Sequence, residues 1–202
     1  GNVTVQGKAG SAAAANQNLM GVAVTNGGTI TAGGAGTVSV TGNGTTTGGV
    51  NASHGVWVTA ANSKITSGGG AVSVTGTGGT TPSGANFGIA VQAGGKITSG
   101  GNGTVTLNGT GGIGGSSNFG VALSDPNSTV TTSGTGDLSI TGHGGSGTGP
   151  AQRGVVVSAA ATVSSTNAGK VTINGTGGSG SSDNYGVDVV DANSLVTTTG
   201  TG

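Results

Sequence analysis

Acidic side chains are the first candidates for chemistry in this 202-residue chain, which has five aspartates and no glutamate. Acid–base hydrolysis of a sugar polymer needs two carboxyl groups that face each other. Asp188 and Asp191 are close in sequence, but we expect one in a strand and the other in a turn. A calcium-dependent polysaccharide lyase would need an acidic cluster with basic residues nearby, and none is visible. The sequence therefore gives little support to an enzyme acting on polysaccharides, and we predict no catalytic residues. The five aspartates are Asp125, Asp137, Asp183, Asp188 and Asp191.

Metal ligands are also sparse. His54 and His143 stand alone, and the chain contains no cysteine. The segment 177–183 has the glycines of a calcium-binding β-roll, but its aspartate is one place late and does not recur. We therefore predict no bound metal and no cofactor.

Hydroxyl side chains recur at fixed places in the sequence. A flat, regular array of them could order water and bind ice, or bind a glycan. Threonine is also a common solvent-facing strand residue that forms cross-strand hydroxyl pairs, so a structural role is the favoured interpretation. Lys64, Lys96 and Leu195 moreover interrupt the neighbouring column. The candidate binding ladder is Thr31, Thr66, Thr98, Thr131, Ser164 and Thr197. A second column is Ser39, Ser73, Thr106, Ser139 and Thr172, flanked by Thr41, Thr75, Asn108, Thr141 and Asn174.

Large side chains gather before one recurrent glycine. We expect Phe87 and Phe119 to stack at a corner, while a sugar-stacking platform is the alternative. His54 and Arg153 are expected to interrupt that column. The column is Met20, His54, Phe87, Phe119, Arg153 and Tyr185.

Charged residues share columns in the same way. Asp137 and Lys170 occupy one outward column, which predicts a surface ion pair. Lys64 and Lys96 should be stacked, which requires both to be solvated.

A repeat of three short runs must position all these side chains. In the runs 88–91 and 104–108, branched apolar residues alternate with small or hydroxyl residues, which indicates strands buried on one face. The middle run, 96–98, has a single apolar residue, Ile97. Glycines between runs are expected to supply positive φ angles at bends. A glycine marks each copy at intervals of 33 to 35 residues: Gly1, Gly36, Gly70, Gly103, Gly136 and Gly169.

This period predicts an all-β fold, a right-handed parallel β-helix (β-solenoid) with three short strands per coil and about six coils of 32–35 residues. Equivalent strands of successive coils should pair in three parallel sheets. Branched side chains then stack inside. One such stack is Val22, Val56, Ile89, Val121, Val155 and Val187.

Composition narrows the function further. Glycine contributes 49 residues, charged residues 5% and aromatics 2%, with net charge zero. Without a basic stripe, nucleic acid is not an expected partner. No run of about 18 apolar residues exists, so the chain is not expected to span a membrane. We expect residues 1–202 to form a single solenoid segment, a window from a longer repeat array without caps.

The recurrent blocks G-V-x-V, x-I-T-S-G-G and T-V-x-V-x-G resemble the β-strand repeats of large bacterial surface proteins. These include autotransporter passengers and filamentous-haemagglutinin-like adhesins. The resemblance covers the whole chain, and its motifs encode a coil rather than an activity. It implies export, display on the outer bacterial surface, and a stalk or fibre that carries adhesive regions elsewhere.

The expected function is thus a non-enzymatic structural or adhesive rod, located outside the cell. Its expected partners are neighbouring copies of the same array, with host or matrix glycans or other cell surfaces as further candidates. The alternative is an ice- or glycan-binding solenoid that uses the threonine and serine ladders.

Overall fold

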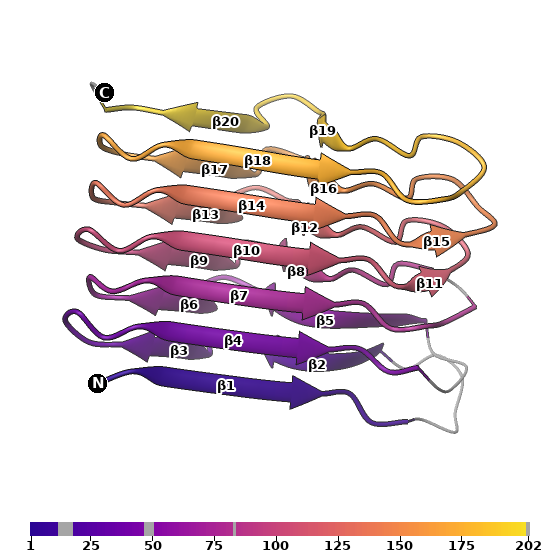
Figure 1. The fold of residues 1–202 in the computed structure, drawn as a ribbon, viewed down its shortest axis with the longest axis horizontal. Helices are drawn as coiled ribbons and strands as arrows, with labels where there is room; N and C mark the ends of the chain where they lie inside the picture. The colour runs from indigo at the N-terminus through magenta and orange to yellow at the C-terminus, as the bar shows by residue number, and fades with distance from the viewer. Residues whose placement is uncertain (12–17, 47–50, 83, 201–202) are drawn as a thin grey trace.

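The computed structural model describes residues 1–11, 18–46, 51–82 and 84–200. The chain is an all-β parallel solenoid whose strands return to the same sheet about every 33 residues. No helix occurs among the described residues. Coils lie one above another from the N-terminus to the C-terminus (Figure 1). The predicted all-β solenoid with three parallel sheets and about six turns is confirmed.

Sheet 1 is built from strands of six residues each and lies at the front of Figure 1. Its side chains alternate between the inside and the outside of the solenoid. In β10, Val105 and Leu107 are buried, whereas Asn108 is exposed. Parallel pairing keeps equivalent residues in register along the whole sheet. Its strands are β1 (Val3–Lys8), β4 (Val38–Asn43), β7 (Val72–Thr77), β10 (Val105–Thr110), β14 (Leu138–His143) and β18 (Val171–Thr176).

Sheet 2 carries the predicted apolar stack, in register from Val22 to Val187. The first five members are at most 7% exposed, whereas Val187 is 43% exposed because no described coil lies over it. Its strands are β2 (Asn18–Val24), β5 (Ala52–Thr59), β8 (Ile89–Gln92), β12 (Val121–Leu123), β16 (Val155–Val157) and β19 (Val187–Val189).

Sheet 3 is built from four-residue strands with one central apolar residue each, such as Ile97. Its strands are β3 (Thr29–Ala32), β6 (Lys64–Ser67), β9 (Lys96–Ser99), β13 (Thr129–Thr132), β17 (Thr162–Ser165) and β20 (Leu195–Thr198). A separate two-stranded sheet forms in the loops that link sheet 1 to sheet 2, from β11 (Ile113–Gly114) and β15 (Ser146–Gly147).

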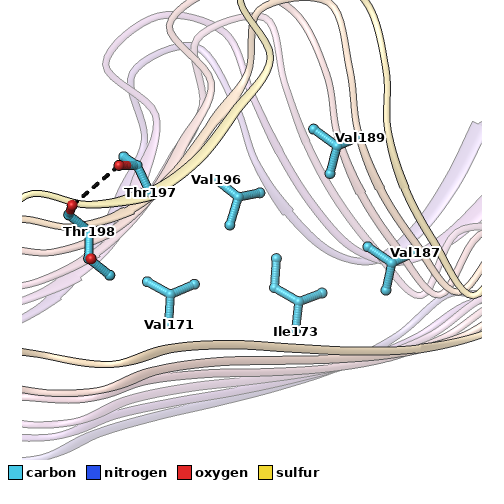
Figure 2. Close-up of a pocket in the computed structure, with 7 residues that line it drawn as sticks. All are labelled: Val171, Ile173, Val187, Val189, Val196, Thr197 and Thr198. Atoms are coloured by element: carbon cyan, nitrogen blue, oxygen red, sulfur yellow. Dashed lines mark hydrogen bonds between the residues drawn. The ribbon is translucent and has the colours of Figure 1, made fainter.

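The three sheets enclose one apolar interior. Figure 2 shows side chains of β18, β19 and β20 pointing toward a common centre. In the last described coil, Val171, Ile173, Val187, Val189 and Val196 line a hollow of about 420 Å³. Equivalent residues of the central coils are fully buried. The hollow is therefore the uncovered end of the core rather than a ligand pocket.

Bends between sheets 2 and 3 only partly follow the expectation that glycine supplies the positive φ angles. Asparagine, aspartate and alanine hold most of them, for example Asn26 (φ 52°), Ala60 (φ 76°) and Asp125 (φ 76°). Asparagine and aspartate tolerate this region because their short polar side chains can hydrogen-bond locally.

Many glycines serve close approach instead. At the base of each sheet 1–sheet 2 loop, two backbones touch. A Cβ on Gly109 would overlap the carbonyl oxygen of Gly120, and a Cβ on Gly120 would overlap the amide of His143. We call the Gly109–Gly120 contact and its equivalents the loop necks.

Candidate interaction surfaces

The bends between sheets 2 and 3 show an alternation along the array. The hydroxyl of Ser63 accepts a hydrogen bond from the Gly27 N–H of the coil below. The same bond recurs from Gly94 to Ser128 and from Ala160 to Ser194. The bond thus links the first coil to the second, the third to the fourth and the fifth to the sixth, so the pattern repeats every two coils. We call this the serine alternation.

All five aspartates are engaged within the array. Asp125 and Asp191 accept backbone N–H groups of the preceding coil, from Ala93 and Ala159. Asp183 accepts the hydroxyls of Ser182 and Tyr185, and these hydrogen bonds lower the pKa of its carboxyl. These carboxylates fix the coil, so the geometry assigns them structural roles.

The predicted ion pair between Asp137 and Lys170 is wrong. The Asp137 carboxylate instead accepts the backbone N–H of Lys170, at 2.8 Å. In the described part of the chain, an ion pair at 2.6 Å joins Arg153, two residues before β16, to Asp188 of the neighbouring strand β19. The stacking of Lys64 on Lys96, with both side chains exposed, is confirmed.

The aromatic column is more continuous than the sequence indicates. Phe87 and Phe119 stack as predicted, with centroids 4.9 Å apart and rings 2° from parallel. His54 does not interrupt them, because its ring stacks on Phe87 at 4.7 Å and 5°. Arg153 also extends the column, with its guanidinium 5.8 Å from the Phe119 centroid and 5.4 Å from that of Tyr185.

This stack does not form a sugar platform. A sugar packs on a ring face, and the faces of Phe87 are covered by His54 and Phe119. The column instead covers Ala90 and Ala122 on the outer side of sheet 2, forming a second apolar cluster. Sequence reasoning missed this cluster, although the alanines opposite the aromatic column were the available signal.

His54 is the buried titratable group of the column. Its Nδ1 accepts the Phe87 N–H at 3.1 Å, so the neutral ring carries its proton on Nε2. Burial lowers the pKa of His54 to about 4 from the ordinary 6.5. Protonation would break this hydrogen bond and place a charge against the stacked phenyl ring.

Acid should therefore destabilise the coil that holds His54. Above pH 6.5 the folded and unfolded states both carry a neutral ring, and below it the unfolded state gains the proton first. The stability is complete above pH 6.5 and is lost progressively down to about pH 4. We expect a loss of about 2–3 kcal/mol in unfolding free energy between pH 7 and pH 4.5.

Urea unfolding at both pH values measures this loss. His54→Phe, which keeps a stacked ring, should lose less stability than the native chain between the two values. His143→Gln, at an exposed histidine, is the matched control and should behave as the native chain does. Equal acid sensitivity of the native chain and His54→Phe would contradict the assignment.

Buried amides form a ladder directly beside this column. The Asn86 amide donates to Asn118 Oδ1 at 2.9 Å, and the Asn118 amide donates to Gln152 Oε1 at 2.8 Å. Asn118 Oδ1 and Gln152 Oε1 also accept backbone N–H groups, and Asn184 Oδ1 accepts the Gln152 N–H. Asn86, Asn118 and Gln152 are fully buried. We call them, with Asn184, the amide ladder.

The loops that link sheet 1 to sheet 2 also take part in pairing between coils where they are described. In the structure they pair through β11 and β15 and through isolated bridges such as Thr80 to Ile113. The sequences Asn-Phe-Gly at 86–88 and 118–120 and Asn-Tyr-Gly at 184–186 were the signal for the amide ladder.

The threonine ladder lies in register along sheet 3. Thr31 is exposed, while Ser164 is only 8% exposed. The hydroxyls of Thr66 and Thr98 bond each other at 2.8 Å. The ladder is therefore narrow and partly self-satisfied. Its remaining members, Thr131 and Thr197, are half-buried.

The outer side of sheet 1 is wider. Its two central columns hold only uncharged polar side chains, in register over six strands. We call these twelve residues the sheet 1 face. They are Thr4, Ser39, Ser73, Thr106, Ser139 and Thr172 in one column, and Gln6, Thr41, Thr75, Asn108, Thr141 and Asn174 in the other.

In the described residues, no group of three or more histidine, aspartate or glutamate side chains is placed to hold a metal ion. Within the same residues, no helix has the length and apolar character needed to cross a membrane. No family model, no curated protein and no solved structure matches the chain.

Proposed function

We propose that this chain is a non-enzymatic structural rod, the stalk or fibre body of a large bacterial surface protein that adheres through other regions. The observation that carries the proposal is the unbroken interior. Val56, Ile89 and Val121 follow one another on consecutive coils, each 0% exposed. Each coil is stabilised by the coils above and below it, so adding coils lengthens the rod without creating a binding or catalytic site.

The charged groups support a non-catalytic role. Asp125, Asp137 and Asp191 hold backbone N–H groups of neighbouring coils, and Asp188 holds Arg153. A catalytic carboxylate must instead reach a substrate. Export and display on the cell surface follow from the resemblance of the strand repeats, and they form part of this proposal.

Ice or glycan binding by the threonine ladder has less support. Thr66 and Thr98 already bond each other, and Ser164 is buried. A ligand would have to compete with these contacts.

Electron microscopy of the purified native protein tests the proposed function. We expect thin, straight particles whose length grows by about 4.8 Å for each coil of sequence. Antibodies against exposed strand residues should label the outside of intact bacteria that express the protein. Compact particles, or labelling only after lysis, would rule out a surface rod.

A further inference from the structure

The sheet 1 face has hydrogen-bonding groups that nothing in the described chain satisfies. Neither the hydroxyls nor the amides of its twelve residues bond a described residue. Elsewhere the polar side chains are used, as in the Thr66–Thr98 pair and the amide ladder. The sheet 1 face is therefore a regular surface whose donors and acceptors are open to a partner.

From this geometry we propose that the sheet 1 face binds the sheet 1 face of a second copy of this chain, with both solenoids running in the same direction. A two-fold axis parallel to the solenoid axis produces this pairing. It places each strand against the same strand of the other copy, in antiparallel orientation. The column of Thr106 then meets the column of Asn108, so hydroxyls lie opposite hydroxyls and amides that can both donate and accept.

Charge favours this arrangement. Ionisable residues of this surface lie only at the two margins of the sheet, at Lys8, Asp137, His143 and Lys170. The two-fold axis brings Asp137 opposite His143 of the other copy, since they are at opposite ends of one strand segment. Lys170 then lies opposite Thr176 in that copy. No two like charges meet, which removes a common barrier to association.

The area indicates a weak contact that grows with length. Six strands at about 4.8 Å and six residues at about 3.3 Å give a face of about 600 Å² per copy. The total of about 1,200 Å² is at the lower limit for specific association. Since coils of equal spacing stay in register, each further pair of coils adds the same contact.

The pairing deepens the proposed rod function and rests on it, because parallel rods fixed at one end to a surface meet in the same direction. The two can fail separately. Single rods that never pair would overturn the pairing alone, whereas compact particles would overturn the rod itself.

Sedimentation of the 202-residue chain, from micromolar to millimolar concentration, tests the pairing. We expect the average mass to rise toward a dimer. The double substitution Ser73→Lys and Thr106→Lys adds charge to adjacent strands at the centre of the face and should weaken association at least about tenfold. Thr129→Lys is the matched control, since it occupies a sheet 3 column that already carries Lys64 and Lys96. It should associate as the native chain does.

Cysteine cross-linking tests the direction, because the chain has no cysteine of its own. Asp137→Cys with His143→Cys should give covalent dimers on oxidation. Thr4→Cys with Thr172→Cys should not, since these residues meet only if the copies run in opposite directions.

Four outcomes would overturn the pairing. They are a monomer at every concentration, association unchanged by the double lysine substitution, dimers from Thr4→Cys with Thr172→Cys, and binding of ice or neutral glycan that the double lysine substitution abolishes without any self-association. The last outcome would show that the sheet 1 face binds ice or a glycan instead of a second copy of the chain.

Discussion

Replacing Gly109 with alanine should destabilise the solenoid by about 3 kcal/mol or more, the upper end of overpacking costs. Gly109 is the last residue but one of β10 and forms a loop neck with Gly120, where the chain returns from its loop. A methyl group on Gly109 would overlap the Gly120 carbonyl oxygen and would lie 2.7 Å from a methyl of Val121. Neither neighbour is the free end of a flexible side chain, so the backbone of the coil must move.

Urea denaturation followed by circular dichroism measures this loss as a lower transition midpoint. Gly33→Ala is the control, since a Cβ there meets no atom within 4 Å. It should change the unfolding free energy by less than about 0.5 kcal/mol. Equal stability of the two alanine variants would show that the loop necks are not close-packed.

Replacing Asn118 with leucine should have a comparable effect, about 3 kcal/mol, although leucine keeps the branched shape of the asparagine side chain. Asn118 Oδ1 accepts both the Asn86 backbone N–H and the Asn86 amide, and its own amide donates to Gln152. Leucine would leave these buried groups without partners, at about 1–3 kcal/mol each, with partial relaxation.

Asn108→Leu is the matched control for Asn118→Leu. Asn108 is exposed and its side chain bonds no described residue, so the same substitution removes nothing that holds the coil. Hydrogen exchange adds a spatial test: protection of the amides of residues 86 and 118 should fall in Asn118→Leu and stay unchanged in Asn108→Leu. Full protection in both variants would contradict the role of the amide ladder.

The sequence predicted the sheets because their signal is local and periodic. Val105 and Leu107 flank Thr106, and every equivalent run shows the same alternation of apolar and hydroxyl residues. Stacked strands bury the apolar residues of such runs on one side. The register from Val22 to Val187 follows from the same columns. Spacing along the chain is sufficient for these features because each coil repeats the previous one.

The surroundings of the candidate sites were harder to predict because they depend on which of two available partners a side chain takes. Lys170 offers the Asp137 carboxylate two possible donors, its side-chain ammonium and its backbone N–H. The carboxylate accepts the backbone N–H. His54 has a polar ring, yet its neutral form stacks on Phe87 as a phenyl ring would. The amide ladder lies in glycine-rich segments whose composition is typical of exposed loops.

The serine alternation sets a rule for how such an array can grow. Since Ser63, Ser128 and Ser194 recur about every 66 residues, the unit that can be duplicated without loss is a pair of coils. Insertion of a single coil would place two bends of the same kind, both with or both without the serine, on neighbouring coils. One backbone N–H donor would then lack its serine acceptor. Related genes that differ in length should therefore differ by even numbers of coils, and odd changes should be rare or accompanied by a compensating serine.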